Sequence, residues 1–258
     1  MKISQRMVTL GLALLFFVPQ FGIGQTNKKA VQKSIESRTK EYEQIAKSIW
    51  NFAEVGYQEE KSSGLLKKTL SDEGFSIKSG VAKIPTAFMA EYGSGQPVIG
   101  ILAEFDALPG ISQEVATQRQ PIENQGAGHA CGHHLFGTAS TAAAIAVKDY
   151  LKKTGQKGTI RLYGTPAEEG GSGKVYMVRA GLFDDVDVVL HWHAGDRNTA
   201  SPSTSMANRS AKFRFHGYSA HAAGAPEKGR SSLDAVEAMN HMVNLMRELG
   251  AETQQKRV

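Results

Sequence analysis

The sequence holds 258 residues, of which 41% are hydrophobic and 21% are charged. This balance allows an ordinary globular core, in one large domain or two small ones, and argues against disorder. The formal net charge is +5, but Lys and Arg are scattered among Asp and Glu instead of forming a run that would track a phosphate backbone, so we expect no nucleic-acid partner.

The first residues have the pattern of a secretory signal peptide. Lys2 and Arg6 precede an apolar run over residues 8–19, and Gly22 and Gly24 offer the small residues that a signal peptidase reads. The run is shorter than the roughly 20 residues that span a bilayer, and no Cys follows it for lipid attachment. We therefore expect residues 1–24 to be cleaved and the protein to be exported to the periplasm or the cell exterior. It would have no stable membrane anchor, and its charge would fall from +5 to +3 with Lys2 and Arg6 removed.

Helices and strands are expected to alternate along the next part of the chain. Apolar residues at three- and four-residue steps predict an amphipathic helix over residues 29–53. Further elements are expected as strands at 87–91, 98–104, 159–163 and 186–192, and as helices at 135–153 and 175–180. Strands that alternate with helices of this length favour a mainly parallel sheet covered on both faces, which is an α/β core.

A polar stretch rich in Ser and Thr, residues 196–205, separates this core from a second unit. We place a domain boundary near Ser205, so that residues 25–205 form the core domain and residues 206–258 the second unit. That unit has one expected strand at 212–215 and one expected helix at 231–249, which is too little to close a core alone. The sequence therefore predicts an incomplete second domain.

Reactive side chains concentrate in short segments that follow an expected strand or open an expected helix. The segments are Glu104–Pro109, His129–His134, Thr165–Gly170 and His191–His193. Ligands of open α/β sheets bind at the carboxyl ends of the strands. A thiol, imidazoles and carboxylates together suit Zn²⁺ or another divalent transition metal better than Ca²⁺ or Mg²⁺.

Each of these signals alone has a plainer explanation. Cys131 is the one cysteine, which excludes an internal disulfide, and a lone thiol near His residues is more often buried than metal-bound. Glu168 and Glu169 could lie on a solvated helix face, although a preceding proline and the glycines that follow weaken that interpretation. On a strand, His191 and His193 share a face, so one could be a ligand and the other a core histidine.

Taken together, the segments HACGH and PAEEGG, in that order, resemble the metal-dependent aminoacylase and carboxypeptidase family of amidohydrolases. The resemblance covers about residues 37–249 and is greatest to the branch that hydrolyses p-aminobenzoyl-glutamate and indoleacetyl-amino-acid conjugates. It implies a zinc-peptidase-like catalytic domain with an inserted α+β lid and dimerisation domain. It also implies two divalent metal ions, Zn²⁺ or Mn²⁺, a small-molecule amide substrate and a homodimer formed through the lid.

The same resemblance implies roles for individual residues. The positions that match the family's metal ligands are Cys131, His133, Glu169 and His193. Glu168 matches the general base, Asp106 the residue that orients the site, and His221 a histidine that reaches a neighbouring subunit's site and polarises the substrate carbonyl. His193 is preferred over His191 because the family ligand lies at the end of this strand.

Two features depart from the family pattern. His134 stands where relatives of the plant-hormone type often have Asp, which leaves the contacts around the ligands open. The family's remaining ligand histidine lies in a C-terminal segment that returns to the catalytic domain, and this sequence ends at Val258 before reaching it. We therefore expect either a fragment or a protein that has lost its activity.

The expected reaction is hydrolysis of an amide bond in an N-acyl amino acid, a p-aminobenzoyl-glutamate-like conjugate or a dipeptide. Metal ions would activate a water molecule, and Glu168 would carry its proton to the leaving amine. One alternative is an exported metal- or substrate-binding protein without turnover. Another is a cysteine-nucleophile hydrolase, in which Cys131 has a depressed pKa and His129 or His133 acts as the base.

Overall fold

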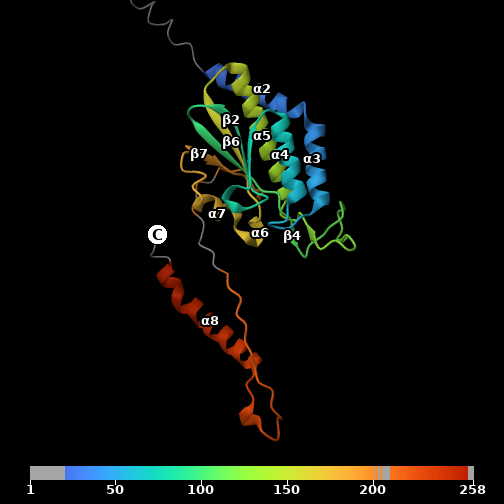
Figure 1. Cartoon of the computed structure of the whole chain (residues 1–258), viewed down its shortest axis with the longest axis vertical. Helices are drawn as coiled ribbons and strands as arrows, with labels where there is room; N and C mark the ends of the chain where they lie inside the picture. The colour runs from blue at the N-terminus through green and yellow to red at the C-terminus, as the bar shows by residue number, and fades with distance from the viewer. Residues whose placement is uncertain (1–20, 201, 203, 205–209, 255–258) are drawn as a thin grey trace, which may run out of the picture. The chain divides into compact units, whose positions relative to one another are not determined.

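The computed structural model describes residues 21–200, 202, 204 and 210–254 (Figure 1). The chain divides into two compact units between Arg197 and Asn198. The expected signal segment up to residue 20 and the expected boundary at Ser205 lie outside the described residues, so both stay predictions. Of the helices in the described ranges, none combines the length and the apolar character needed to cross a membrane.

The first unit is built on a five-stranded sheet with the order β1-β2-β6-β3-β7. The strands are β1 (Ser76–Ser79), β2 (Phe88–Ser94), β3 (Val98–Ala103), β6 (Gly158–Gly164) and β7 (Val188–Leu190). A small second sheet pairs β4 (Leu108–Pro109) with β5 (Ala127–Gly128). The α/β class is confirmed.

The sheet is mixed, whereas the sequence led us to expect a mainly parallel one. Strands β6, β3 and β7 are parallel, while β1 pairs with β2, and β2 with β6, in antiparallel fashion. The reason is the length of the connections. Only residues 80–87 join β1 to β2, and only residues 95–97 join β2 to β3, whereas a parallel pair needs a crossover of a dozen residues or more. Strand β2 therefore runs opposite to β3 and to β6, which is parallel to β3. The connections from β3 to β6 and from β6 to β7 contain helices and are long enough.

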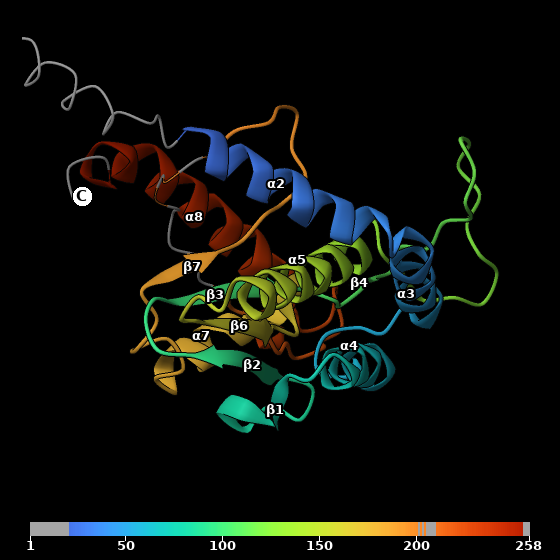
Figure 2. The same cartoon turned by 90° about the horizontal axis from the view of Figure 1, so that it is seen from above.

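Four helices cover one face of the sheet (Figure 2). They are α2 (Phe21–Glu36), α3 (Thr39–Phe52), α4 (Glu60–Asp72) and α5 (His133–Thr154). Helix α5 lies against β3 and β6, and the core under these helices includes Ile49, Leu66, Phe88, Ile145 and Leu162. Helix α4 was not expected from the sequence.

The helix expected over residues 29–53 is in fact two helices, with a break after Glu36. Hydroxyl groups satisfy the carbonyls at this break, since Ser37 Oγ donates to the carbonyl of Ser34 at 2.7 Å and Thr39 Oγ1 donates to that of Glu36 at 2.8 Å. Such side-chain hydrogen bonds compete with helix continuation. The break lets α2 and α3 take different directions over the same face (Figure 2).

Shorter helical segments cover the opposite face, as expected. They are η1 (Val81–Lys83) and α7 (Gly173–Arg179), while α6 (Glu168–Gly171) is a short segment after β6 with no buried residue. Met177 of α7 packs with Met89 and Tyr163, whose neighbours Phe88 and Leu162 belong to the core on the other face. This alternation is the two-residue period of a buried strand.

The second unit contains η2 (Pro226–Lys228) and α8 (Ser232–Gln254). Helix α8 confirms the helix expected at 231–249. The strand expected at 212–215 is wrong, because these residues are irregular and Phe213 is exposed. A strand forms by pairing, and the pairing that the described part of this unit shows is a single bridge between Tyr218 and Arg230.

Candidate metal centre

One edge of the main sheet gathers the segments that the sequence singled out. Because β3, β6 and β7 are parallel, their carboxyl ends meet at this edge. The chain leaves β3 into Glu104–Asp106, leaves β6 into Thr165–Glu169 and leaves β7 into His191–His193. The N-terminus of α5 brings His133 to the same place, within 3.8 Å of side chains from the first two segments.

His133 is completely buried and its ring is held by Asp106. Nδ1 lies 2.9 Å from Asp106 Oδ1 and 3.0 Å from the Asp106 carbonyl oxygen. Both partners are acceptors, so Nδ1 carries the hydrogen and Nε2 is left as a free donor atom for a metal. Asp106 Oδ2 also accepts the backbone N–H of Glu169 at 2.9 Å. Asp106 therefore orients both side chains, which is the arrangement expected of a residue behind metal ligands.

The predicted ligands form two overlapping groups. In one, ligand atoms of Cys131, His133 and His193 lie within 4.8 Å of one another, and in the other those of His133, Glu168 and Glu169 do. Cys131 Sγ is 3.2 Å from His193 Nε2. His191, by contrast, places Nε2 3.3 Å from Glu104. This geometry favours His193 over His191 as the ligand.

Several buried polar atoms at the centre have no hydrogen-bond partner among the described residues. They include His133 Nε2, Glu104 Oε2 and Glu169 Oε1. Buried polar atoms are nearly always satisfied, and an orphaned imidazole nitrogen beside orphaned carboxylate oxygens is what a metal ion would complete. Together with the Cys131 thiol and the His193 imidazole, these donors fit a divalent transition-metal ion.

The environment of Cys131 is wrong for a free nucleophile. Burial and the negative charges of Glu169, Glu168 and Glu104 raise the pKa of the Cys131 thiol to about 11. A nucleophilic cysteine needs a depressed pKa. His129, one of the two bases considered, is buried and donates Nε2–H to the carbonyl of Ile49 at 3.0 Å. The cysteine-nucleophile alternative therefore has no support.

Glu59 is a buried carboxylate of the site that the sequence analysis missed. Oε1 accepts the backbone N–H of Ala167 at 2.8 Å, and Oε2 accepts the hydroxyl of Thr86 at 2.8 Å. Ala167 has a left-handed backbone with φ 57°, just before Glu168. Glu59 thus holds the turn that presents the two glutamates. Its place in a charged run at the start of a helix resembles an ordinary solvated face, so nothing local marked it.

Nor did the sequence indicate that Glu104 and Lys174 form an ion pair at the site. Burial raises the pKa of Glu104, but hydrogen bonds from His191 and Lys174 outweigh this and lower the pKa to about 2. Glu104 therefore stays ionised although only 2% of it is exposed. Its position directly after a buried strand, two residues before Asp106, was the available signal.

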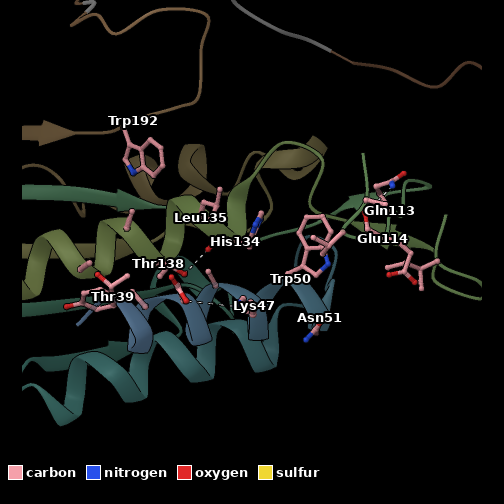
Figure 3. A pocket seen from close by; sticks show the side chains of 18 of the residues that line it. Thr39, Lys47, Trp50, Asn51, Gln113, Glu114, His134, Leu135, Thr138 and Trp192 are labelled. Atoms are coloured by element: carbon pink, nitrogen blue, oxygen red, sulfur yellow. Dashed lines mark hydrogen bonds and ion pairs between the residues drawn. The ribbon is translucent and has the colours of Figure 1, made fainter. Parts of the chain in front are cut away.

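His134 lines the aromatic groove shown in Figure 3. The groove lies between α3, α5 and the loop over residues 113–122, and has a volume of about 1300 Å³. Trp50 meets His134 edge to face at a centroid distance of 4.9 Å. Burial and the neighbouring His133 lower the pKa of His134 to about 4. The position where this chain departs from plant-hormone-type relatives therefore contacts the groove.

His221 belongs to the second unit. Its Nδ1 accepts the backbone N–H groups of Ala223 at 3.2 Å and Gly224 at 3.0 Å. This local turn fixes the ring but assigns no reaction partner, so the role of His221 stays a prediction.

Known proteins are similar to this chain in sequence and in fold. The family model for peptidase family M20/M25/M40 matches residues 100–255. One of the subunits of p-aminobenzoyl-glutamate hydrolase from Escherichia coli K12 is 47% identical over 226 residues, which cover 84% of this chain and 46% of the relative. Xaa-Arg dipeptidase of Mus musculus is 28% identical over 233 residues, covering 86% of this chain and 50% of the relative.

A solved structure agrees with these matches. The YXEP protein of Bacillus subtilis, described as a dinuclear metal-binding peptidase, superposes with a TM-score of 0.51 at 26% identity, over 61% of this chain and 42% of that protein. The chain spans about half the length of the curated relatives it matches. Because the family model matches more than half of the chain, and a 47% identical relative covers most of it, the chain belongs to peptidase family M20/M25/M40.

Proposed function

We propose that the protein is a metal-dependent amidohydrolase that cleaves a small-molecule amide. The observation that carries this proposal is the meeting of Cys131, His133, Glu169 and His193 beside Glu168 at one sheet edge. The relatives named above act, by their names, on p-aminobenzoyl-glutamate and on Xaa-Arg dipeptides. A p-aminobenzoyl-glutamate-like conjugate, an N-acyl amino acid or a dipeptide is therefore the proposed substrate class.

The proposed cofactor is a pair of divalent ions, Zn²⁺ or Mn²⁺. When bound, such ions lower the pKa of a water molecule and polarise a carbonyl group. The residues that would hold them are Cys131, His133, Glu169 and His193. Asp106 supports this role, because its hydrogen bond to Nδ1 keeps the His133 tautomer in which Nε2 is free to bind.

Glu168 is the proposed general base. Its side chain is 44% exposed, whereas that of Glu169 is 15% exposed, so Glu168 is the more open of the two to water and substrate. Glu168 Oε2 lies 3.8 Å from His133 Nε2, close to where the ligand atoms converge. A carboxylate in this position can take a proton from water and pass it to the leaving amine. No covalent intermediate with the chain is needed.

The test combines metal analysis with a substrate panel. Full-length protein should contain about two Zn²⁺ or Mn²⁺ per subunit and hydrolyse at least one of p-aminobenzoyl-glutamate, N-acyl amino acids or dipeptides. Removal of metal with a chelator should abolish turnover, and added Zn²⁺ or Mn²⁺ should restore it. A folded, metal-free protein with full activity, or a metal-loaded protein inert on all three classes, contradicts the proposal. No observation favours the alternative of a binding protein without turnover.

Assembly and location remain proposals of their own. We propose a homodimer through the second unit, with His221 polarising the substrate carbonyl in the neighbouring subunit's site. Light scattering of the full-length protein tests the homodimer. The activity of His221→Ala, which should be lower than that of the wild type, tests the role of His221. We also propose export and cleavage before Gln25, motivated by the basic and apolar pattern of the first residues. Mass spectrometry that finds Met1 on soluble cytoplasmic protein contradicts export.

A further inference from the structure

Glu104 directly follows β3 at the centre of the site, and it is not among the proposed metal ligands named above. We propose that Glu104 is a further metal ligand, which contributes Oε2 to the ion bound by His133 Nε2. This inference rests on the proposed metal dependence and adds a carboxylate to it.

The first argument is distance. Glu104 Oε2 lies 3.2 Å from His133 Nε2, closer than the Glu169 oxygen at 3.7 Å or the Glu168 oxygen at 3.8 Å. Two donor atoms bound to one tetrahedral ion at about 2.0–2.1 Å lie about 3.3 Å apart. The Glu104–His133 pair therefore has the spacing of two ligands of one ion.

The second argument is that the two facing atoms, Glu104 Oε2 and His133 Nε2, have no hydrogen-bond partner among the described residues. Glu104 is 2% exposed and His133 is 0% exposed. Since His133 Nδ1 donates to Asp106, Nε2 of the neutral ring would face the carboxylate oxygen with a lone pair. A metal ion between the two atoms would satisfy both of them in this buried site.

The third argument is that Glu104 is already held in place. Its other oxygen, Oε1, accepts a hydrogen bond from Lys174 Nζ and lies 3.3 Å from His191 Nε2. Rotating Oε2 away from the centre would break this buried ion pair. A ligand whose second oxygen is fixed in this way is oriented before the ion arrives.

The backbone supports the same contact. A Cβ added to Gly137 of α5 would lie 2.7 Å from the carbonyl oxygen of Glu104, so a larger residue would push the helix off the end of β3. The glycine lets α5 approach closely, one turn after His133. The pairing of Glu104 with His133 is therefore built into the packing of α5 on the sheet.

The experiment compares metal binding of Glu104→Gln with that of the wild type in full-length protein. Zn²⁺ stoichiometry and affinity are measured by competition with a chromophoric chelator, and Co²⁺ absorption reports the ligand set. We expect at least about a 10-fold loss of affinity for one ion and a changed Co²⁺ spectrum. The matched control is Glu91→Gln, another partly buried glutamate in an ion pair, with Arg161, far from the ligands in the sheet. It should bind Zn²⁺ within about twofold of the wild type.

The outcomes separate the two proposals. If the wild type binds no metal, the proposed function fails. If the wild type binds two ions and Glu104→Gln binds both with unchanged affinity and Co²⁺ spectrum, only the present inference fails. A metal-loaded crystal structure of the wild type decides the matter even if the variant does not fold. Glu104 Oε2 within about 2.2 Å of an ion supports the inference. Separation from every ion by more than about 3 Å overturns it, whatever the affinity of the variant.

Discussion

Helix α5 carries a cluster of charged side chains at each end, and the two clusters are built differently. Near its C-terminal end, Lys148 Nζ lies 2.6 Å from Glu73 and 2.8 Å from Asp149, while Arg38 also bonds Glu73. At its N-terminal end, His133 faces carboxylates whose nearest oxygens include unpartnered ones among the residues that the structure describes. One cluster is complete, because its charges are matched, whereas the other is incomplete, because it sets Lys174 against several carboxylates and keeps an excess of negative charge.

This difference separates a structural cluster from a binding site. The complete cluster ties the start of α3, through Arg38, and the end of α4, through Glu73, to α5. Its charges are matched, so it needs nothing from outside. The incomplete cluster would be costly to keep buried unless a cation supplied the missing charge.

The largest expected effect comes from Glu168→Gln at the incomplete cluster. The amide is nearly isosteric but cannot accept a proton from water, so turnover of the full-length enzyme should fall by about 10²–10⁴-fold with metal content unchanged. The neighbouring Glu169→Gln is the matched comparison and should lose metal affinity instead. Normal turnover in both variants would show that the assignment of the two glutamates is wrong.

The next largest effect is expected from Asp106→Asn. The amide cannot replace both carboxylate oxygens, one of which accepts from His133 and the other from Glu169. We expect Zn²⁺ affinity to fall by about 10–100-fold, the range seen when residues behind metal ligands are changed. Titration with a competing chelator measures this. Unchanged affinity would mean that Asp106 does not orient the ligands.

A smaller effect is expected when the complete cluster is broken by Lys148→Met. Glu73 keeps Arg38, so the loss of the Lys148 hydrogen bonds should lower the free energy of unfolding by about 1–2 kcal/mol. Metal should raise the melting temperature of this variant and of the wild type by the same amount, because the far end of α5 does not touch the ion. Calorimetry with and without Zn²⁺ measures both effects. If the loss of stability caused by Lys148→Met differed with and without Zn²⁺, the two clusters would be energetically coupled, which contradicts our expectation that they are independent.

The smallest expected effect is on acid stability. Burial raises the pKa of Glu73, but the hydrogen bonds from Lys148 and Arg38 outweigh burial, so the pKa lies below its ordinary value of 4.5. The unfolded chain therefore binds more protons than the folded one below that pH, so this stabilisation is complete above pH 4.5 and is lost as the pH falls. Glu73→Gln should flatten the acid side of the stability profile by about 1 kcal/mol or less. The control is Glu43→Gln, which removes an exposed glutamate and should leave the pH profile of stability unchanged. If Glu43→Gln flattens the acid side as much as Glu73→Gln does, the change in net charge explains the effect and the ion pairs of Glu73 do not.

Much of the fold followed from local pattern. The hydrophobic period predicted α5, α7 and α8 and the positions of β2, β3 and β6 to within a few residues. The order HACGH then PAEEGG carried the family resemblance, and that resemblance implied the residues that the structure brings together at one edge. The helices and strands depend on residues within one turn or one strand of each other, and these residues are close together in the sequence.

The tertiary structure alone decided what depends on residues far apart in the chain. The pairing of β2 with β6 follows from the insertion of β6 between β2 and β3, and the contact between Cys131 and His193, which lie 62 residues apart, follows from the packing of their two segments. Glu59 lies 108 residues from the Ala167 N–H that it accepts. In the sequence, Glu59 looks like an ordinary charged surface residue, and Glu104 stands in a segment of reactive side chains with no sign of its partners Lys174 and His191. Each of these glutamates has its role because it is buried. Burial depends on how distant elements pack together, so a local sequence pattern cannot predict it.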